Sequence, residues 1–481
     1  MTQYIKGKPF KTPKYVQIIE YIKNRIAIGE WTIGSKIYSQ RKLANMFKVN
    51  RSTVITALEE LQAEGLIEGK RGMGNIVTNN TWSLLTNKPQ NWNDHVNIGF
   101  HQPSRIMVQQ INEGESNSNL IQLSKGELSP ELFPITQMKQ SIKELANELG
   151  AFGYEEPKGL LPLRQSISTY LKSHGIKASP DCILIVSGAL QALDLISVGL
   201  LKPGSTVLLE KPSYLYSLHV FQSAGMLLAG LPIDHNGILP KSILAQKQKV
   251  QQSVLYTIPS FHNPTGNVMS DSRRAELLKV CKEERIPIIE DDIYRELWID
   301  KKAPLALKAK DTNGQVLYLG SLSKTLTPGL RIGWIVGPQS VINSLADIKM
   351  QLDYGSSSLS QRIAFKWLSN GFYQEHVLSV RKQLKIRRDA LVGYLEKYLK
   401  DIATWEVPGG GLFIWVRINK IVSMRSLYST ALAKGILVNP GHIYGQDEGQ
   451  YIRLSYAFAS LVDLEKGIRE LNRIIRALCR H

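Results

Sequence analysis

Alternating strand-like and helical segments in the last three quarters of the chain constrain its fold more than any other feature of the sequence. From residue 120 onward, short apolar runs are separated by longer amphipathic stretches. Examples of these runs are "CILIVSG", "TVLLEKPSY", "SVLYTIPSFHNPTG", "IPIIEDDIY", "QVLYLGSLSK" and "RIGWIVG". Because strands that alternate with helices pair in one parallel sheet, the pattern predicts an α/β domain with a mostly parallel central sheet. Ligands of such sheets bind beyond the carboxyl ends of the strands.

Several of these runs end in polar motifs, which we therefore expect to gather at one edge of the sheet. The segment "SGALQAL" (187–193) places a glycine turn before a helix, whose free backbone N–H groups suit a phosphate. The motif "EDDIY" supplies carboxylates, "HNPTG" (262–266) an amide, and "SLSK" a lysine amine. Each motif alone has an ordinary reading, such as a surface lysine or a turn asparagine. Together they supply what pyridoxal phosphate needs: an amine for a Schiff base, a carboxylate for the ring nitrogen and a phosphate cradle.

The ordered set resembles the fold-type I pyridoxal-phosphate enzymes, nearest the aminotransferase branch, over residues 120–475. The resemblance implies that Lys324 binds pyridoxal 5'-phosphate as an internal aldimine and is the catalytic residue. The other implied cofactor contacts are Asp291 at the ring nitrogen, Tyr294 and Asn263 at the ring hydroxyl, Tyr214 stacked on the ring, and the backbone of Ala189 and Leu190 with Ser321, Ser323 and Arg331 at the phosphate. Two residues match substrate-binding positions: Arg453 clamps a carboxylate bidentately, and Tyr154 reaches the site of a partner subunit.

The first eighty residues have a different pattern, typical of short helices followed by a β-hairpin. Isoleucines recur at helical spacing from Ile18 to Ile26, and Gly29 ends that segment. Ser39 is placed to cap a helix "QRKLANMF", and after the turn "KVN" a second helix begins at "RSTVITALEELQAEGL". Two short helices joined by a tight turn predict a helix-turn-helix whose second helix can enter the major groove of DNA. The stretch "GLIEGKRGMGNIVT" reads as a hairpin wing.

The charge of this segment favours a polyanionic partner. Residues 1–80 contain 13 lysines and arginines against 6 acidic residues, within a chain of net charge +18. A small helical domain with a solvated basic face would share this charge. The motifs as a whole resemble the winged helix-turn-helix of the GntR family of bacterial regulators. The resemblance implies DNA contacts from Ser39, Arg41, Arg51, Ser52, Thr53 and the wing around Gly72.

The sequence between the two patterns is rich in Asn, Gln and Ser and only weakly periodic. It predicts a division into a DNA-binding domain (1–80), a linker (81–119) and an aminotransferase-like domain (120–481). The 3 cysteines lie far apart with no metal-like spacing, which predicts no metal site and a reducing cytoplasm. No signal-peptide pattern is visible at the start, and we expect no membrane association.

A GntR-like segment joined by a long linker to an aminotransferase-like domain resembles the MocR family of transcriptional regulators, which includes the GABA-responsive type. The resemblance implies a cytoplasmic homodimer that binds double-stranded promoter DNA and senses a small amino-acid-like effector through exchange at Lys324. A second hypothesis is a catalytically active aminotransferase with an accessory DNA-binding domain, because the catalytic set is complete and turnover stays open. A third, that the large domain serves only to dimerise, is weaker because the cofactor residues are present.

Overall fold

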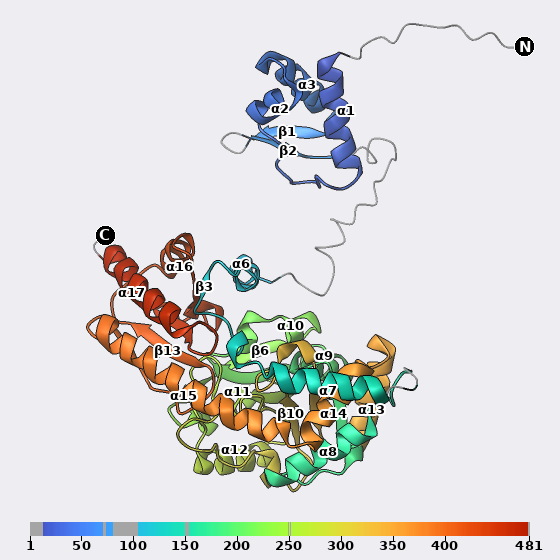
Figure 1. Cartoon of the computed structure of the whole chain (residues 1–481), viewed down its shortest axis with the longest axis vertical. Helices are drawn as coiled ribbons and strands as arrows, with labels where there is room; N and C mark the ends of the chain where they lie inside the picture. The colour runs from blue at the N-terminus through green and yellow to red at the C-terminus, as the bar shows by residue number, and fades with distance from the viewer. Residues whose placement is uncertain are drawn as a thin grey trace, which may run out of the picture. The chain divides into compact units, whose positions relative to one another are not determined.

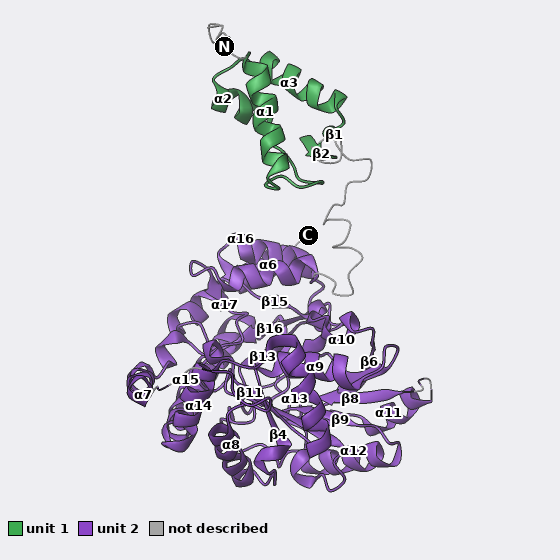
Figure 2. Ribbon diagram, turned by 90° about the vertical axis from the view of Figure 1, so that its right-hand side faces the viewer, with its two compact units in different colours: residues 1–99 green, residues 100–481 purple. Residues whose placement is uncertain are grey.

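The computed structural model describes residues 13–70, 74–79, 104–148, 150, 153–248, 250 and 252–479. The chain divides into two compact units, residues 1–99 and residues 100–481, coloured separately in Figure 2. We call them the N-terminal and the C-terminal unit and describe each by itself.

In the described residues of the N-terminal unit, helices are followed by a β-hairpin (Figure 1). Its elements are α1 (Lys14–Ala27), α2 (Gln40–Phe47), α3 (Arg51–Ala63), β1 (Ile67–Lys70) and β2 (Gly74–Val77), and the two strands pair antiparallel. The predicted cap of α2 is confirmed, since the Ser39 side chain accepts a hydrogen bond from the Lys42 N–H. The predicted apolar face of α3 is confirmed as well, because Val54, Leu58 and Leu61 are buried. The short helices therefore fold as the sequence pattern predicts.

An eight-stranded sheet forms the centre of the C-terminal unit, in the order β4-β11-β10-β9-β8-β5-β6-β7. The strands are β4 (Ile183–Val186), β5 (Thr206–Lys211), β6 (Leu227–Asp234), β7 (Gly237–Ile238), β8 (Ser253–Thr257), β9 (Ile288–Asp291), β10 (Val316–Ser321) and β11 (Gly333–Val336). The five neighbouring strands β10, β9, β8, β5 and β6 pair parallel, whereas β11 and β7 run antiparallel to their neighbours. The predicted mostly parallel sheet is thus confirmed.

Both faces of this sheet are covered by helices, which is why its strands read as continuous apolar runs. In β4, Leu184 and Val186 pack into one core with α9 (Ala189–Leu200), while Ile183 and Ile185 pack into a second core with α8 (Leu161–Ser173). The alternation follows from the two-residue period of a strand. The remaining helices of the described chain are α6 (Ile106–Glu115), α7 (Ile135–Glu148), α10 (Val220–Ser223), α11 (Pro240–Lys247), α12 (Asp271–Glu283), α13 (Gln339–Asp353), α14 (Ser358–Ser369), α15 (Phe372–Leu399), α16 (Met424–Ala433) and α17 (Leu461–Leu478).

The described part of the C-terminal unit also contains two smaller sheets. An antiparallel sheet has the order β12 (Ala403–Trp405), β13 (Phe413–Ile418), β16 (Tyr451–Ser455) and β15 (Asn439–Pro440), and β3 (Ile121–Gln122) pairs parallel with β14 (Ile436–Leu437). Helix α6 packs next to β14 and buries Val108 and Ile111 in the core. This helix lies inside the segment that the weak sequence periodicity assigned to the linker. Within the described ranges, no helix has the length and apolarity needed to cross a membrane.

Candidate functional site

Lys324 lies three residues beyond the end of β10 and lines a cavity of about 330 Å³ in the C-terminal unit. Its Nζ donates a hydrogen bond of 2.7 Å to the main-chain oxygen of Gly126. Burial lowers the pKa of Lys324 below that of an ordinary lysine. A lowered pKa leaves more of the amine neutral, which is the nucleophilic form that a carbonyl group requires.

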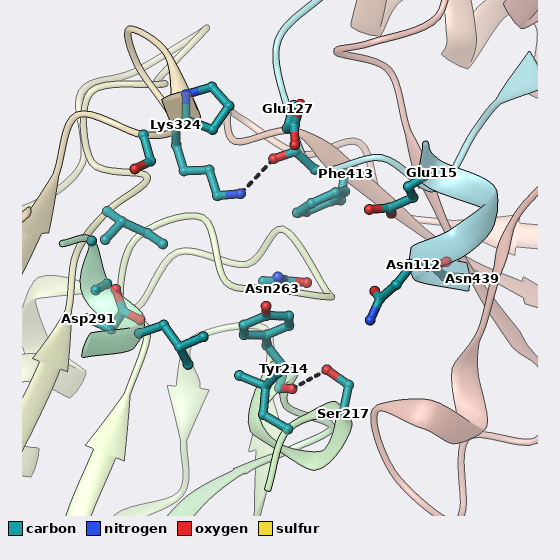
Figure 3. A pocket seen from close by; sticks show the side chains of 18 of the residues that line it. Asn112, Glu115, Glu127, Tyr214, Ser217, Asn263, Asp291, Lys324, Phe413 and Asn439 are labelled. Atoms are coloured by element: carbon teal, nitrogen blue, oxygen red, sulfur yellow. Dashed lines mark hydrogen bonds between the residues drawn. The ribbon is translucent and has the colours of Figure 1, made fainter. Parts of the chain in front are cut away.

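Asp291, the last residue of β9, faces the same cavity (Figure 3). Its Oδ2 accepts a hydrogen bond of 2.7 Å from the Tyr256 hydroxyl, and its Oδ1 is buried without a partner in the described chain. Burial raises the pKa of Asp291 to about 6. The next residue, Asp292, does not line the cavity and pairs with Arg295 Nε at 3.3 Å instead. The structure thus brings Asp291, and not Asp292, to the cavity that holds Lys324.

The predicted phosphate contacts line one wall of the cavity. Gly188, with φ of 89°, turns the chain into α9, and the first N–H groups of a helix have no acceptor within it. Arg331 Nη2 donates to the Ser187 main-chain oxygen at 2.8 Å, and a Cβ on Gly188 would lie only 2.8 Å from that nitrogen. A glycine at this turn therefore lets the guanidinium approach the helix start. Further groups on this wall are Ala189, Leu190, Ser321 and Ser323.

The residues predicted to contact the cofactor ring also lie close together at the cavity. Asn263 Nδ2 donates to the Tyr294 hydroxyl at 3.3 Å, and both side chains are buried at the cavity wall. Tyr214 begins a short 3-10 helix and lies below Asn263 in Figure 3. These three side chains come from separate loops that follow β5, β8 and β9. The strand ends of the parallel sheet therefore collect them, as the fold rule for such sheets predicts.

Arg453 on β16 is buried at the cavity wall, with its guanidinium packed over two aromatic rings. Its Nη1 donates to Asn263 Oδ1 at 2.9 Å, and its Nη2 donates to the Ser124 main-chain oxygen at 2.7 Å. The guanidinium carbon lies 3.9 Å from the ring centre of Phe413 and 5.0 Å from that of Tyr444. The neutral acceptors leave its positive charge available to an anionic ligand, which is what a carboxylate clamp requires.

Tyr154 lies away from these residues. It does not line the cavity of this chain, is 81% exposed, and has its ring centre 5.2 Å from that of Tyr354. A role at the site of a partner subunit stays a prediction.

Other cavity residues were not singled out by the sequence motifs. Helix α6 contributes Val108, Ile111, Asn112 and Glu115, and the small sheet contributes Phe413 and Asn439, with Tyr444 next to it. Local sequence gives little signal for them, because the cavity joins segments more than 300 residues apart. The pairing of β3 with β14 and the packing of α6 next to β14 bring the early segment to the small sheet.

Taken together, the cavity residues fit pyridoxal phosphate. The buried oxygens Asp291 Oδ1 and Ser323 Oγ have no hydrogen-bond partner in the described part of the chain, although buried polar atoms normally find one. Asp291 Oδ1 can accept a hydrogen bond from a protonated pyridine nitrogen. Ser323 Oγ and the Arg331 guanidinium can donate to a phosphate, and Lys324 Nζ can bond covalently to an aldehyde carbon.

In the N-terminal unit, the predicted DNA contacts lie at the starts of two helices. Ser39 and Arg41 lie at the start of α2, whereas Arg51, Ser52 and Thr53 begin α3. Arg41, Arg51 and Ser52 are exposed, and Arg51 Nε donates to Gln40 Oε1 at 2.9 Å. Gly72 lies outside the described residues.

Comparison with known proteins identifies both units. Residues 14–77 match the model of the bacterial regulatory proteins of the gntR family, and residues 118–471 match that of the class I and II aminotransferases. The chain belongs to the MocR family. This MocR protein is 60% identical to the uncharacterized HTH-type transcriptional regulator YdfD of Bacillus subtilis, over 97% of both chains. It is 36% identical to the HTH-type transcriptional regulator NorG of Staphylococcus aureus, over 92% of this chain and 99% of that one.

Solved structures resemble the C-terminal unit of this MocR protein. The multiple substrate aminotransferase from Thermococcus profundus is 30% identical with a TM-score of 0.74, covering 79% of this chain and 96% of its own. The alpha-aminoadipate aminotransferase LysN from Thermus thermophilus, complexed with N-(5'-phosphopyridoxyl)-L-leucine, is 28% identical with a TM-score of 0.74, covering 81% of this chain and 99% of its own. The protein is thus a helix-turn-helix transcriptional regulator of the GntR and MocR type with an aminotransferase fold.

Proposed function

We propose that this MocR regulator binds pyridoxal 5'-phosphate at Lys324, senses an amino-acid-like compound there, and controls a promoter through its N-terminal unit. One observation carries the proposal: a cavity in the C-terminal unit joins Lys324, the unpartnered oxygen of Asp291 and the start of α9, in a chain whose N-terminal unit exposes Arg41 and Arg51. The phosphopyridoxyl-leucine complex of a structure with the same fold supports it.

The residues have separate tasks in this proposal. Bound pyridoxal phosphate would offer its aldehyde carbon to an amine. Lys324 would hold the cofactor until the amine of the effector takes its place, Asp291 would hold a proton at the ring nitrogen, and Arg453 would fix the effector's carboxylate. Tyr294 and Asn263 would bond the ring hydroxyl, Tyr214 would stack on the ring, and the α9 start, Ser321, Ser323 and Arg331 would hold the phosphate. Ser39, Arg41, Arg51, Ser52, Thr53 and the wing around Gly72 would contact DNA.

The effector acts on transcription only through a difference in affinity between two states of the protein. We further propose that the protein works in the cytoplasm as a homodimer, in which Tyr154 reaches the site of the second subunit.

Two measurements on the purified protein test the proposed function. Visible absorption that borohydride fixes to the chain would report the cofactor, and a DNA-shift assay with the region upstream of its own gene would report promoter binding. A panel of amino compounds added to both assays should shift them together. A protein that binds neither cofactor nor that DNA would refute the proposal.

A catalytic aminotransferase is the second candidate, because the cavity brings the full set of cofactor residues together with Arg453. Production of keto acid from the same amino compounds distinguishes the two. Multiple turnovers without any effect on DNA binding would favour the enzyme, whereas an effect on DNA binding without turnover would favour the regulator.

A further inference from the structure

One side of the cavity consists of hydrogen-bond acceptors that the proposed cofactor contacts do not use. Figure 3 shows Glu115, Asn112 and Asn439 together across the cavity from Asp291 and Lys324. The first two come from α6 and the third from β15. These residues line the same cavity as Lys324 and Arg453, which the proposed function assigns to the amine and the carboxylate of an amino acid.

Asn439 carries a buried acceptor without a donor. Its side chain is only 3% exposed, and its Nδ2 donates to the Tyr444 hydroxyl at 2.9 Å. Its Oδ1 has no hydrogen-bond partner in the part of the chain that the structure describes. A buried acceptor left without a donor is unfavourable, so a ligand that donates to this oxygen gains free energy.

Glu115 adds a negative charge on the same side. Its Oε1 accepts a 3.3 Å hydrogen bond from Ser124 Oγ, and burial raises its pKa more than nearby Arg453 lowers it. Two cations act on its carboxylate, and neither forms an ion pair with it in the described chain: Lys125 Nζ donates to the main-chain oxygen of Glu115 and pairs with Glu127 at 3.6 Å. Both Nη atoms of Arg453 donate to neutral oxygens.

A role of Glu115 in folding alone does not account for its charge. Its main-chain oxygen, which any residue would supply, binds Lys125. Within the described residues, its side chain forms only the weak hydrogen bond from Ser124. A glutamine would serve Ser124 equally well. A carboxylate facing a cavity is instead suited to a cationic group.

We propose that Glu115 and Asn439 form a subsite for a second, cationic nitrogen of the effector, which makes the effector a basic amino acid. This inference rests on the proposed function, which places the first amine and the carboxylate at Lys324 and Arg453. An apolar side chain would leave the Asn439 oxygen without a donor, and a neutral polar one would leave the Glu115 carboxylate without a cation. An acidic one would place a like charge next to Glu115, which is unfavourable at short range.

The test uses the full-length protein loaded with pyridoxal phosphate, titrated with L-ornithine, L-norvaline and L-glutamate while the cofactor absorbance is followed. Ornithine and norvaline have the same carbon chain and differ in the terminal amine. Since a hydrogen bond to a charged group corresponds to roughly 10- to 100-fold in affinity, ornithine should half-saturate at a concentration at least about 10-fold below that of norvaline. Glutamate should bind more weakly than norvaline.

The variant Glu115→Gln should lower the ornithine preference by about 10-fold and leave the norvaline titration nearly unchanged. Glu113→Gln is the matched control, because Glu113 is exposed on the same helix and does not line the cavity. Asn439→Asp is a second variant, which should raise the preference for ornithine by adding a negative charge to the subsite.

Equal half-saturation by ornithine and norvaline in the parent protein would overturn the subsite, as would an unchanged ratio in Glu115→Gln. If no amino compound of a wide panel changed the absorbance of the loaded protein, the proposed function itself would fail. A response to neutral amino acids alone would instead keep the proposed function and reject the subsite.

Discussion

Replacing Asp291 by asparagine should stabilise the cofactor-free protein against unfolding and weaken the binding of the cofactor. The asparagine oxygen can still accept the hydrogen bond that Tyr256 donates to Oδ2 at 2.7 Å, so the main change is the loss of a buried negative charge. A buried negative charge destabilises the fold unless a positively charged group binds next to it. In the proposed function that group is the protonated ring nitrogen of the cofactor.

The size of the effect follows from the pKa of Asp291, which burial raises from 3.8 to about 6. The folded state holds the proton of the Asp291 carboxyl more tightly than the unfolded state does. Ionisation of Asp291 therefore leaves the free energy of unfolding unchanged below the lower pKa and lowers it by the full amount above the higher pKa. At 1.36 kcal/mol per pKa unit, the full cost is about 3 kcal/mol at pH 8 and roughly half of that at pH 5. The advantage of Asp291→Asn in the cofactor-free protein should therefore grow by roughly 1 kcal/mol between these two pH values.

Urea unfolding of the cofactor-free parent and variant at pH 5 and pH 8 measures this difference, and dialysis of the loaded proteins measures cofactor retention. Retention should fall roughly 10- to 100-fold in Asp291→Asn, the range for a lost charge-assisted hydrogen bond. The matched control is Asp292→Asn, which breaks the buried pair with Arg295 and should cost about 3 kcal/mol while leaving retention unchanged. Equal retention in the parent and Asp291→Asn, or a pH-independent stability difference, would refute the assignment of Asp291.

Three further substitutions test separate parts of the proposed function. Lys324→Ala should carry no pyridoxal phosphate after borohydride reduction, and covalent cofactor on this variant in a mass spectrum would show that another residue holds it. Arg51→Ala should bind DNA about 1–3 kcal/mol more weakly if a base contact is lost. If a phosphate contact is lost, the slope of log affinity against log salt concentration should be lower by about one. Unchanged affinity and slope in a salt titration would remove Arg51 from the interface. Arg453→Ala should still load the cofactor and bind DNA but lose the effector's influence on a reporter, a coupling of about 5- to 150-fold; a parental response would mean that the effector's carboxylate binds elsewhere.

The local sequence was sufficient to predict which residues of the candidate site lie at the ends of adjacent strands. Lys324 and Asp291 each follow an apolar run, and parallel pairing of β9 with β10 brings those runs together. The choice of Asp291 over the adjacent Asp292 came from the resemblance to the aminotransferases, and the structure places Asp291 at the cavity and Asp292 against Arg295. The position of such motifs can be predicted from the sequence because the two-residue period of a strand fixes which residues share a face.

The opposite side of the cavity could not be predicted in this way. Glu115 lies in a stretch whose periodicity is weak, and α6 forms there because Val108 and Ile111 are buried against a core assembled mostly from later residues. Asn439 lies on a strand of two residues, whose position depends on pairing with β16. Tertiary contacts rather than local propensity decide such segments, so their contribution to the site becomes visible only in the fold.

The same helix is where we expect binding at the cavity to have its largest effect on the rest of the chain. Helix α6 has 10 residues and buries only Val108, Ile111 and Gly114, so its local stability should be low compared with β10, which precedes Lys324, and β16, which carries Arg453. A cation held by Glu115 would contribute roughly 1.5–3 kcal/mol to the ordered helix, which is the size of a typical allosteric coupling. Because α6 is the first described helix after the N-terminal unit, this free energy would be available to the segment that leads to the DNA-binding domain. Hydrogen exchange of the α6 amides should therefore slow when L-ornithine is added to the loaded protein, and should not slow in Glu115→Gln. Equal protection of α6 with and without the ligand would show that the signal leaves the cavity by another route.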